Sequence, residues 1–123
     1  MEEAFDSTVE YGSEATVVSV SGEVDVATAP TLRQRLDEAL DRGPGLLVVD
    51  LTGVSFIDST ALGVLIGAHE RCTAAGTTLR LVVAEPRILK IFEITGLTEV
   101  FTITAAPDPT APDSTAPDGV SRN

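Results

Sequence analysis

Residues 48–67 read VVDLTGVSFIDSTALGVLIG, and this stretch changes from a strand pattern to a helix pattern within a few residues. Leu46 to Leu51 is a short apolar run with an acid at Asp50, typical of a buried strand, while Leu62 and Leu65 recur at helical spacing. We expect a tight loop between them, with Ser59 where the helix begins. Backbone N–H groups at a helix N-terminus lack intrahelical partners and favour negative charge. A phosphoryl group on Ser59 would therefore cost the fold little, and the stretch predicts a candidate switch.

Strand patterns alternate with helix patterns on both sides of this stretch. The first two strands, separated by Gly12 and Ser13, are expected to pair as an antiparallel hairpin. Later strands alternate with helices and are expected to run parallel. The sequence thus predicts a single α/β domain over residues 1–104, with a mixed four- to five-stranded sheet, an N-terminal hairpin and about three to four packed helices. The expected strands are 5–11, 16–21, 46–51, 79–84 and 100–104.

Helix boundaries are indicated by residues with known end preferences. Thr28 is a predicted N-cap followed by Pro30 in the first turn, and Gly43 follows the last turn of that helix. Gly76 is the expected C-cap of the helix that begins near Ser59. A third helix is expected to start at Pro86.

Ser59 also has an ordinary explanation. Serine and aspartate are common N-caps, so Asp58 or Ser59 could satisfy an amide of a helix that starts near Thr60. The residue three positions after Ser59 is Leu62, not Glu or Gln, so no capping box specifies the cap. The position of Ser59 alone leaves open whether it caps the helix or accepts a phosphoryl group.

Three motifs together resemble the STAS domain of bacterial anti-sigma factor antagonists. They are GEVD at residues 22–25, VVDLTGVSFIDSTALGVL around Ser59, and LRLVVAEPRILKIFEITGL at residues 79–97. The resemblance covers nearly all of residues 5–104. It implies that Ser59 is phosphorylated by an anti-sigma factor with serine kinase activity. It also implies that the unphosphorylated protein binds this anti-sigma factor and releases the sigma factor, and that a serine phosphatase of the metal-dependent type resets the switch.

The predicted partner-binding surface is small and acidic. By the resemblance, the GEVD loop lies beside the phosphorylation loop and helps to contact the kinase, although Gly22 and Asp25 could be simple turn formers. A phosphate adds about −1.5 to −2 charge, which should weaken binding without changing the fold. The expected contact residues are Glu23, Asp25, Asp58, Ser59, Thr60 and Ala61.

Charge and composition narrow the choice of partner. The formal net charge is −11, and residues 1–104 hold 16 acidic and 7 basic side chains. This balance opposes binding to nucleic acid or to an anionic membrane and favours a protein partner. The N-terminus has no signal-peptide pattern, and the longest apolar run, Ala61 to Ala68, is far shorter than the roughly 20 residues of a membrane span. With Cys72 as the single cysteine, we expect a cytoplasmic protein.

Composition changes abruptly near Ala105. Ala-Pro-Asp begins at residues 106, 111 and 116, and large apolar side chains are absent until Val120. Such a segment cannot bury enough surface to offset its ordering entropy. Residues 105–123 are therefore a predicted disordered tail, more typical of a solubilising end than of a docking motif.

Enzymatic and metal chemistry are not expected. His69 is the sole histidine, and ten residues of helix would place it roughly 15 Å from Ser59, too far for a catalytic dyad. His69 and Cys72 have no further His or Cys with which to complete a zinc site. We expect no cofactor and no metal, since ATP and Mg²⁺ belong to the kinase in the implied scheme.

Two other functions stay open. A receiver-like domain could accept a phosphoryl group on Asp50 at a strand end, but such a domain would need an acidic pair after the first strand and a lysine after a late one. Neither is found, because the sole lysine, Lys90, falls in a predicted helix. The second alternative is a STAS module for ligand sensing or scaffold assembly, in which Ser59 is only a cap.

Overall fold

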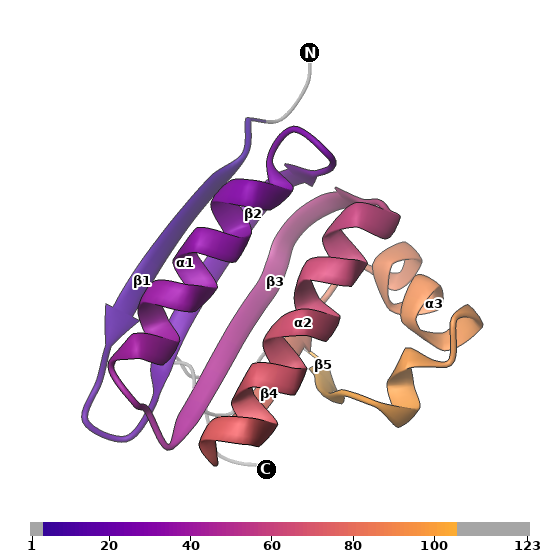
Figure 1. Ribbon diagram of the computed structural model, residues 1–123. Helices are drawn as coiled ribbons and strands as arrows, with labels where there is room; N and C mark the ends of the chain where they lie inside the picture. The colour runs from indigo at the N-terminus through magenta and orange to yellow at the C-terminus, as the bar shows by residue number, and fades with distance from the viewer. Residues whose placement is uncertain (1–3, 106–123) are drawn as a thin grey trace, which may run out of the picture.

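The computed structural model describes residues 4–105, in which five strands form one mixed sheet. The strands lie in the order β1-β2-β3-β4-β5 (Figure 1). β1 and β2 pair antiparallel, and each later neighbouring pair is parallel. The predicted α/β class, mixed sheet and N-terminal hairpin are confirmed. The strands are β1 Asp6–Tyr11, β2 Thr16–Val24, β3 Leu46–Ile57, β4 Thr78–Val83 and β5 Thr102–Ala105.

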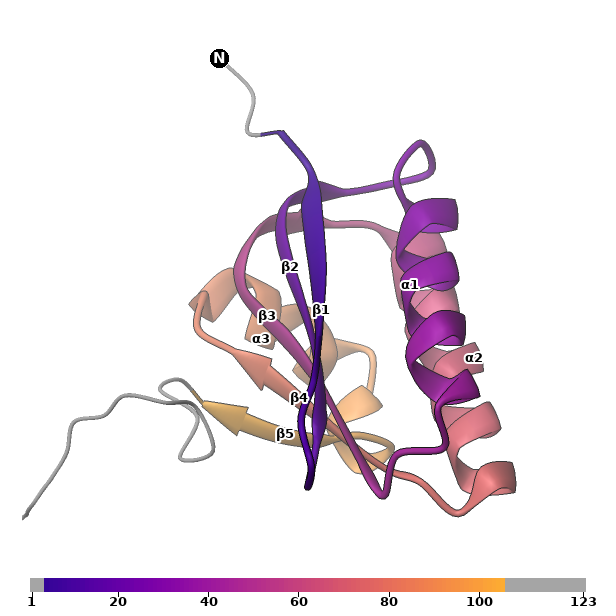
Figure 2. The ribbon, with the colours of Figure 1, turned by 90° about the vertical axis from the view of Figure 1, so that its left-hand side faces the viewer.

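Three α-helices and one short 3₁₀ helix connect the parallel strands. They are α1 Ala29–Asp41, α2 Ser59–Ala75, α3 Pro86–Ile94 and the 3₁₀ helix Leu97–Glu99. Helices α1 and α2 lie side by side on one face of the sheet, while α3 lies beyond α2 at the β4–β5 side (Figures 1 and 2). This arrangement places the beginnings of α1 and α2 at the same end of the sheet.

The core is aliphatic and lies between the sheet and the helices. Alternate residues of the strands point into it because side-chain direction alternates along a strand. Phe92 of α3 and Phe101 close one side with their rings edge to face at 5.9 Å between centroids. The buried residues that share this core include Val18, Val20, Leu32, Leu36, Leu47, Val49, Leu51, Leu65 and Leu81.

Strands β2 and β3 extend further than the sequence predicts. Their expected ends were residues 21 and 51, but β2 continues to Val24 and β3 to Ile57, so most of the expected loop before Ser59 is strand. β2 and β3 stay paired over this length, with two shifts of register, one between Ser19 and Ser21 and one between Gly22 and Glu23. Gly22 has a φ of 87° within the strand, a conformation that favours glycine. Gly22 is therefore a bulge residue and not a simple turn former.

Helix ends agree with the sequence in most places. Gly43 and Gly76 both have positive φ just past the ends of α1 and α2. Thr28 occupies the N-cap position of α1, but its side chain makes no capping hydrogen bond. Ala105 ends β5, and residues 106–123 of the predicted tail lie outside the described residues. In the described part of the chain, no helix is long and apolar enough to cross a membrane.

Candidate functional site

The ends of β2 and β3 bring the two predicted loops together. Val24 is paired with Ile57 at the last position of both strands, and the Asp58 backbone N–H donates to the Val24 carbonyl oxygen at 3.2 Å. The turn after β2 and the start of α2 consequently lie side by side at the upper end of the molecule in Figure 1. The GEVD segment and the serine loop are therefore adjacent in the fold.

Asp58 is the N-cap of α2. Its backbone is extended, and its carboxylate Oδ1 accepts from the Ala61 N–H at 3.0 Å. Ser59 is the first helical residue and is exposed to solvent. Within residues 4–105, the Ser59 hydroxyl has no hydrogen-bond partner. Of the two residues that the sequence offers as the N-cap, Asp58 therefore caps α2 and Ser59 does not.

The other predicted contact residues differ in exposure. Thr60 is exposed beside Ser59, and Glu23 is half-buried on β2. Ala61 is fully buried, because it lies on the inner face of α2 together with Leu62 and Leu65. The Ala61 side chain therefore does not reach the surface of the isolated domain, and its backbone N–H is taken by the Asp58 cap, so contact of a partner with Ala61 stays a prediction.

Asp25 holds the turn between β2 and α1. Its Oδ1 accepts from the backbone N–H groups of Ala27 at 3.0 Å and Thr28 at 3.2 Å. The Thr28 hydroxyl donates to the Glu23 carbonyl at 3.1 Å and accepts from the Asp25 N–H at 3.0 Å. These bonds explain why Thr28 does not cap α1 with its side chain. The alternative role of Asp25 as a turn former is thus borne out by the geometry.

Val26 is an exposed apolar residue in the turn that Asp25 holds. It stands between Asp25 and Ala27 in this turn, and 70% of its surface is exposed. Polar residues are usual in such turns, so an apolar β-branched residue is uncommon there.

Negative charge at this end of the sheet is not neutralised locally. Glu23, Asp25 and Asp58 form no ion pair within residues 4–105. From Ser59 to Ala68, α2 carries no charged side chain. The Ser59 hydroxyl therefore lies in an environment with acidic neighbours and a helix N-terminus that attracts anions.

Asp50 does not occupy the strand-end position that a receiver-like acceptor would need. It lies in the middle of β3, paired with Ser19 and Val82, because β3 continues for seven further residues to Ile57. Its Oδ1 accepts from the Thr52 N–H at 2.9 Å. The prediction that placed Asp50 at a strand end is wrong.

His69 and Cys72 lie away from Ser59, further along α2. The His69 ring meets Phe101 edge to face at 5.5 Å, and Cys72 is buried. Burial raises the pKa of the Cys72 thiol, and the nearby Arg71 only partly offsets this effect. Over the range 4–105, no group of three or more potential metal ligands occurs.

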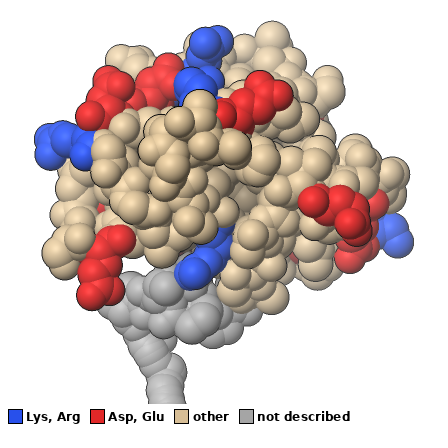
Figure 3. Space-filling view, turned by 60° about the horizontal axis from the view of Figure 1, so that its bottom comes forward, with Lys and Arg blue, Asp and Glu red and all other residues tan. Residues whose placement is uncertain are grey.

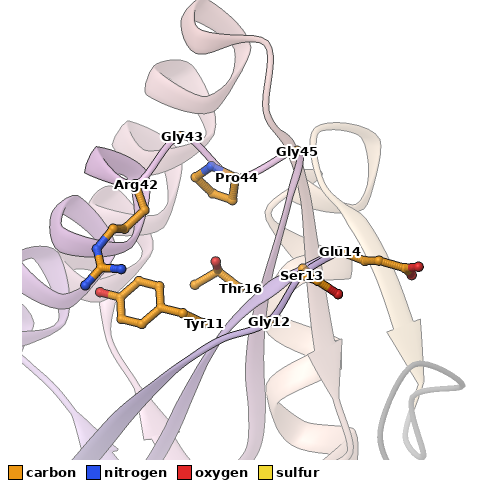
Figure 4. Close-up of a pocket in the computed structure, with 10 residues that line it drawn as sticks. Tyr11, Gly12, Ser13, Glu14, Thr16, Arg42, Gly43, Pro44 and Gly45 are labelled. Carbon is orange, nitrogen blue, oxygen red and sulfur yellow. The ribbon is translucent and has the colours of Figure 1, made fainter.

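A cavity of about 320 Å³ lies at the opposite end of the sheet, between the β1–β2 turn and the α1–β3 loop (Figure 4). The Arg42 guanidinium stacks over the Tyr11 ring at 4.1 Å, and the Glu14 side chain points away. Figure 3, seen from this end, shows small clusters in which acidic and basic groups lie next to one another, with large uncharged areas between the clusters. The cavity lies at the start of β3, whereas Ser59 follows its end, so it is separate from the serine site.

The comparison with protein families agrees with this geometry. A model described as "STAS domain" matches residues 7–109. The chain belongs to the STAS domain family. An anti-sigma-B factor antagonist of Bacillus subtilis is 38% identical over 88 residues, which cover 72% of this chain and 80% of that protein.

Solved structures give the same result for the STAS fold. An anti-sigma factor antagonist from Mycobacterium paratuberculosis superimposes with a TM-score of 0.77 at 31% identity, covering 86% of this chain and 88% of that one. The unphosphorylated form of the anti-sigma factor antagonist SpoIIAA superimposes with a TM-score of 0.71 at 22% identity, covering 85% and 90%. The second likeness concerns the fold alone.

Proposed function

We propose that this protein is an anti-sigma factor antagonist that is switched by phosphorylation of Ser59. The unmodified form binds an anti-sigma factor with serine kinase activity and thereby releases a sigma factor. The observation that carries the proposal is the exposed Ser59 hydroxyl at the first position of α2, which is unbonded within residues 4–105 and lies next to a separate capping residue, Asp58. The names of the similar proteins from Bacillus subtilis and Mycobacterium paratuberculosis support the same function.

The surroundings of Ser59 support a change in affinity without a change in fold. Asp58 already caps α2, so modification of Ser59 removes no bond that holds the helix. The helix N-terminus tolerates the added negative charge, which is about −1.5 to −2 at neutral pH. Within a closely packed contact, the bulk of the phosphate and its repulsion from Asp58 and its acidic neighbours oppose binding. A penalty of about 1.4 kcal/mol is enough for a tenfold loss of affinity.

The chemistry of the switch belongs to the partners in this proposal. The anti-sigma factor supplies the catalytic base together with ATP and Mg²⁺, and Ser59 supplies the accepting hydroxyl. A serine phosphatase of the metal-dependent type removes the phosphate. The protein itself acts in the cytoplasm as a binding protein and substrate, without a metal or cofactor of its own, and its contact surface recognises neither nucleic acid nor membrane.

Phosphorylation can be tested with the full chain and a kinase-type anti-sigma factor of the same organism, in the presence of ATP and Mg²⁺. Mass spectrometry should find one phosphoryl group on the wild type, located on Ser59, and none on Ser59→Ala. Thr60→Ala is the control for site specificity, because Thr60 carries the neighbouring exposed hydroxyl, and this variant should still receive one phosphoryl group on Ser59. Equal modification of Ser59→Ala and the wild type, or no modification of either, would contradict the proposal.

A further inference from the structure

Two buried valines lie on the face of the sheet that points away from the core. Val48 on β3 and Val82 on β4 each stand between two residues of the common core, but neither belongs to that core. Because side chains alternate along a strand, both valines lie on the opposite face, hereafter the outer face. They are nevertheless only 2% and 1% exposed. The register places Val17, Ser19, Val48, Asp50, Arg80, Val82, Thr102 and Thr104 on the outer face.

No helix within residues 4–105 covers the outer face. The three crossovers from β2 to β5 each lead to the next strand in the same direction, so right-handed connections place all three helices on one face. Leu32 of α1, Leu65 of α2 and Phe92 of α3 accordingly share one core. Parallel strands normally have both faces covered, and β3 and β4 carry the unbroken buried runs 47–49 and 81–83 that such strands show.

We propose that the outer face is the docking surface for the chain's own segment 106–110, APDPT. This segment follows Ala105, which is paired with Val83, the residue after Val82. β4 is the neighbour of β5, and β3 lies two strands from it, about 10 Å at the usual strand spacing. Five extended residues span up to about 17 Å, which is enough to pass over both valines.

The other end of the chain is too short to reach these valines. Ala4 lies beside Gly22 of β2, three positions along the strand from Ser19, which is in the same row of the sheet as Val82. Two strands across and three residues along amount to about 14 Å. Residues 1–3 span at most roughly 10 Å when fully extended. The segment that follows β5 is therefore the part of the chain that fits.

The composition of the 106–110 segment suits an apolar sheet face with one positive charge. Pro107 and Pro109 have no backbone N–H group, so they bring no donor that would need a partner over the valines. Asp108 carries the charge that complements Arg80, which is paired with Val48 on this face. The STAS family match also continues to residue 109, past the end of β5.

The proposal assigns the first residues of the compositionally predicted tail to the folded domain. It does not depend on the proposed function, because it concerns a contact within one chain. A protein that bound no anti-sigma factor could still have its outer face covered by residues 106–110.

Stability of the full-length chain tests whether the 106–110 segment contributes to the fold. Replacing residues 106–110 by Gly-Ser-Gly-Ser-Gly should lower the urea midpoint, because the cover over Val48 and Val82 is lost. The matched control is the same replacement at residues 116–120, APDGV, which also begins with Ala-Pro-Asp and should leave the midpoint unchanged. A wild-type midpoint for the first variant, or an equal loss in both, would overturn the proposal.

The place of the contact is tested by NMR with a nitroxide label on Thr110→Cys in the full chain. All samples carry Cys72→Ala, so the label attaches only at residue 110. The methyl signals of Val48 and Val82 should broaden more than those of Val18, which lies in the core on the other face. They should stay sharp when a labelled chain without isotopes is mixed with an isotope-enriched chain without the label. Sharp Val48 and Val82 signals in the first sample, or broadening in the mixture that assigns the face to a second copy, would overturn the proposal.

Discussion

The carboxylate of Asp58 accepts a hydrogen bond from the backbone N–H of Ala61 at 3.0 Å, so α2 is capped without help from Ser59. Under the proposed function, capping and modification therefore fall on two adjacent residues, Asp58 and Ser59. The division matters because a serine that both capped the helix and accepted phosphate would change the helix end whenever it was modified. Here Ser59, the proposed site of modification, is exposed and its hydroxyl is unbonded within the described chain.

Replacing Asp58 by alanine should destabilise the domain. The change removes the acceptor for the Ala61 N–H, and loss of such a cap costs about 0.5–2 kcal/mol. Asp58→Asn keeps an acceptor at the same position and should lose much less. Urea denaturation of both variants measures the difference, and an Asp58→Ala domain as stable as Asp58→Asn would contradict the capping role.

Gly63 on α2 should be replaceable by alanine with a gain in stability. It is exposed, and a Cβ atom built there meets nothing within 4 Å, so only the helix propensity changes. That change favours alanine by roughly 0.5–1 kcal/mol. Thermal denaturation should give a higher midpoint for Gly63→Ala than for the wild type, and a lower midpoint would disagree with the open space around this residue.

Gly22→Ala should have the opposite effect. Gly22 lies in the bulge of β2 with a φ of 87°, and its Cβ would come within 2.3 Å of the Ala4 carbonyl oxygen. Left-handed strain of about 1–3 kcal/mol adds to this backbone clash. We expect a clear loss of stability in chemical denaturation, and a wild-type midpoint would show that the β2 bulge is not as described.

The buried Cys72 thiol should make stability fall in alkaline solution. Burial raises its pKa in the folded domain above the ordinary value of 9.0. The folded protein then keeps a proton that the unfolded chain loses, so the free energy of unfolding falls as pH rises above that value, by at most about 1.4 kcal/mol per pH unit. Below the unfolded pKa the contribution is fully present.

The comparison that isolates this effect is urea denaturation of the wild type and Cys72→Ala at pH 7 and pH 10. The variant lacks the thiol, so its stability should fall less between the two pH values, even if its stability at pH 7 is lower because of the lost packing. Identical pH dependence of the two proteins would show that Cys72 does not titrate differently in the folded domain.

Much of the fold follows from local patterns in the sequence. The apolar runs at residues 46–51 and 79–84 have the composition of strands covered by helices, and Gly43 and Gly76 end helices because they adopt positive φ. The β1–β2 hairpin was equally visible from the two short strand patterns and the turn residues between them.

The parts that the sequence did not reveal depend on tertiary contacts. The extra length of β2 and β3 depends on the pairing of these two strands, which continues across two register shifts. The strands are far apart in the sequence, so no local pattern encodes this pairing. Ala61 follows Thr60 in a small-residue run, yet the rotation of α2 turns it into the core. The sequence places Asp25 among the acidic contact residues, but in the structure its carboxylate accepts hydrogen bonds from backbone N–H groups of its own turn.

The most direct test of the central claim is calorimetric titration of a kinase-type anti-sigma factor with three forms of the full chain: unmodified, phosphorylated on Ser59, and Ser59→Ala. Circular dichroism of each form should be the same, since phosphorylation is expected to leave the fold unchanged. The unmodified protein and Ser59→Ala should bind with similar affinity, and the phosphorylated form at least about tenfold more weakly. Equal affinity of the phosphorylated and unmodified forms would contradict the account.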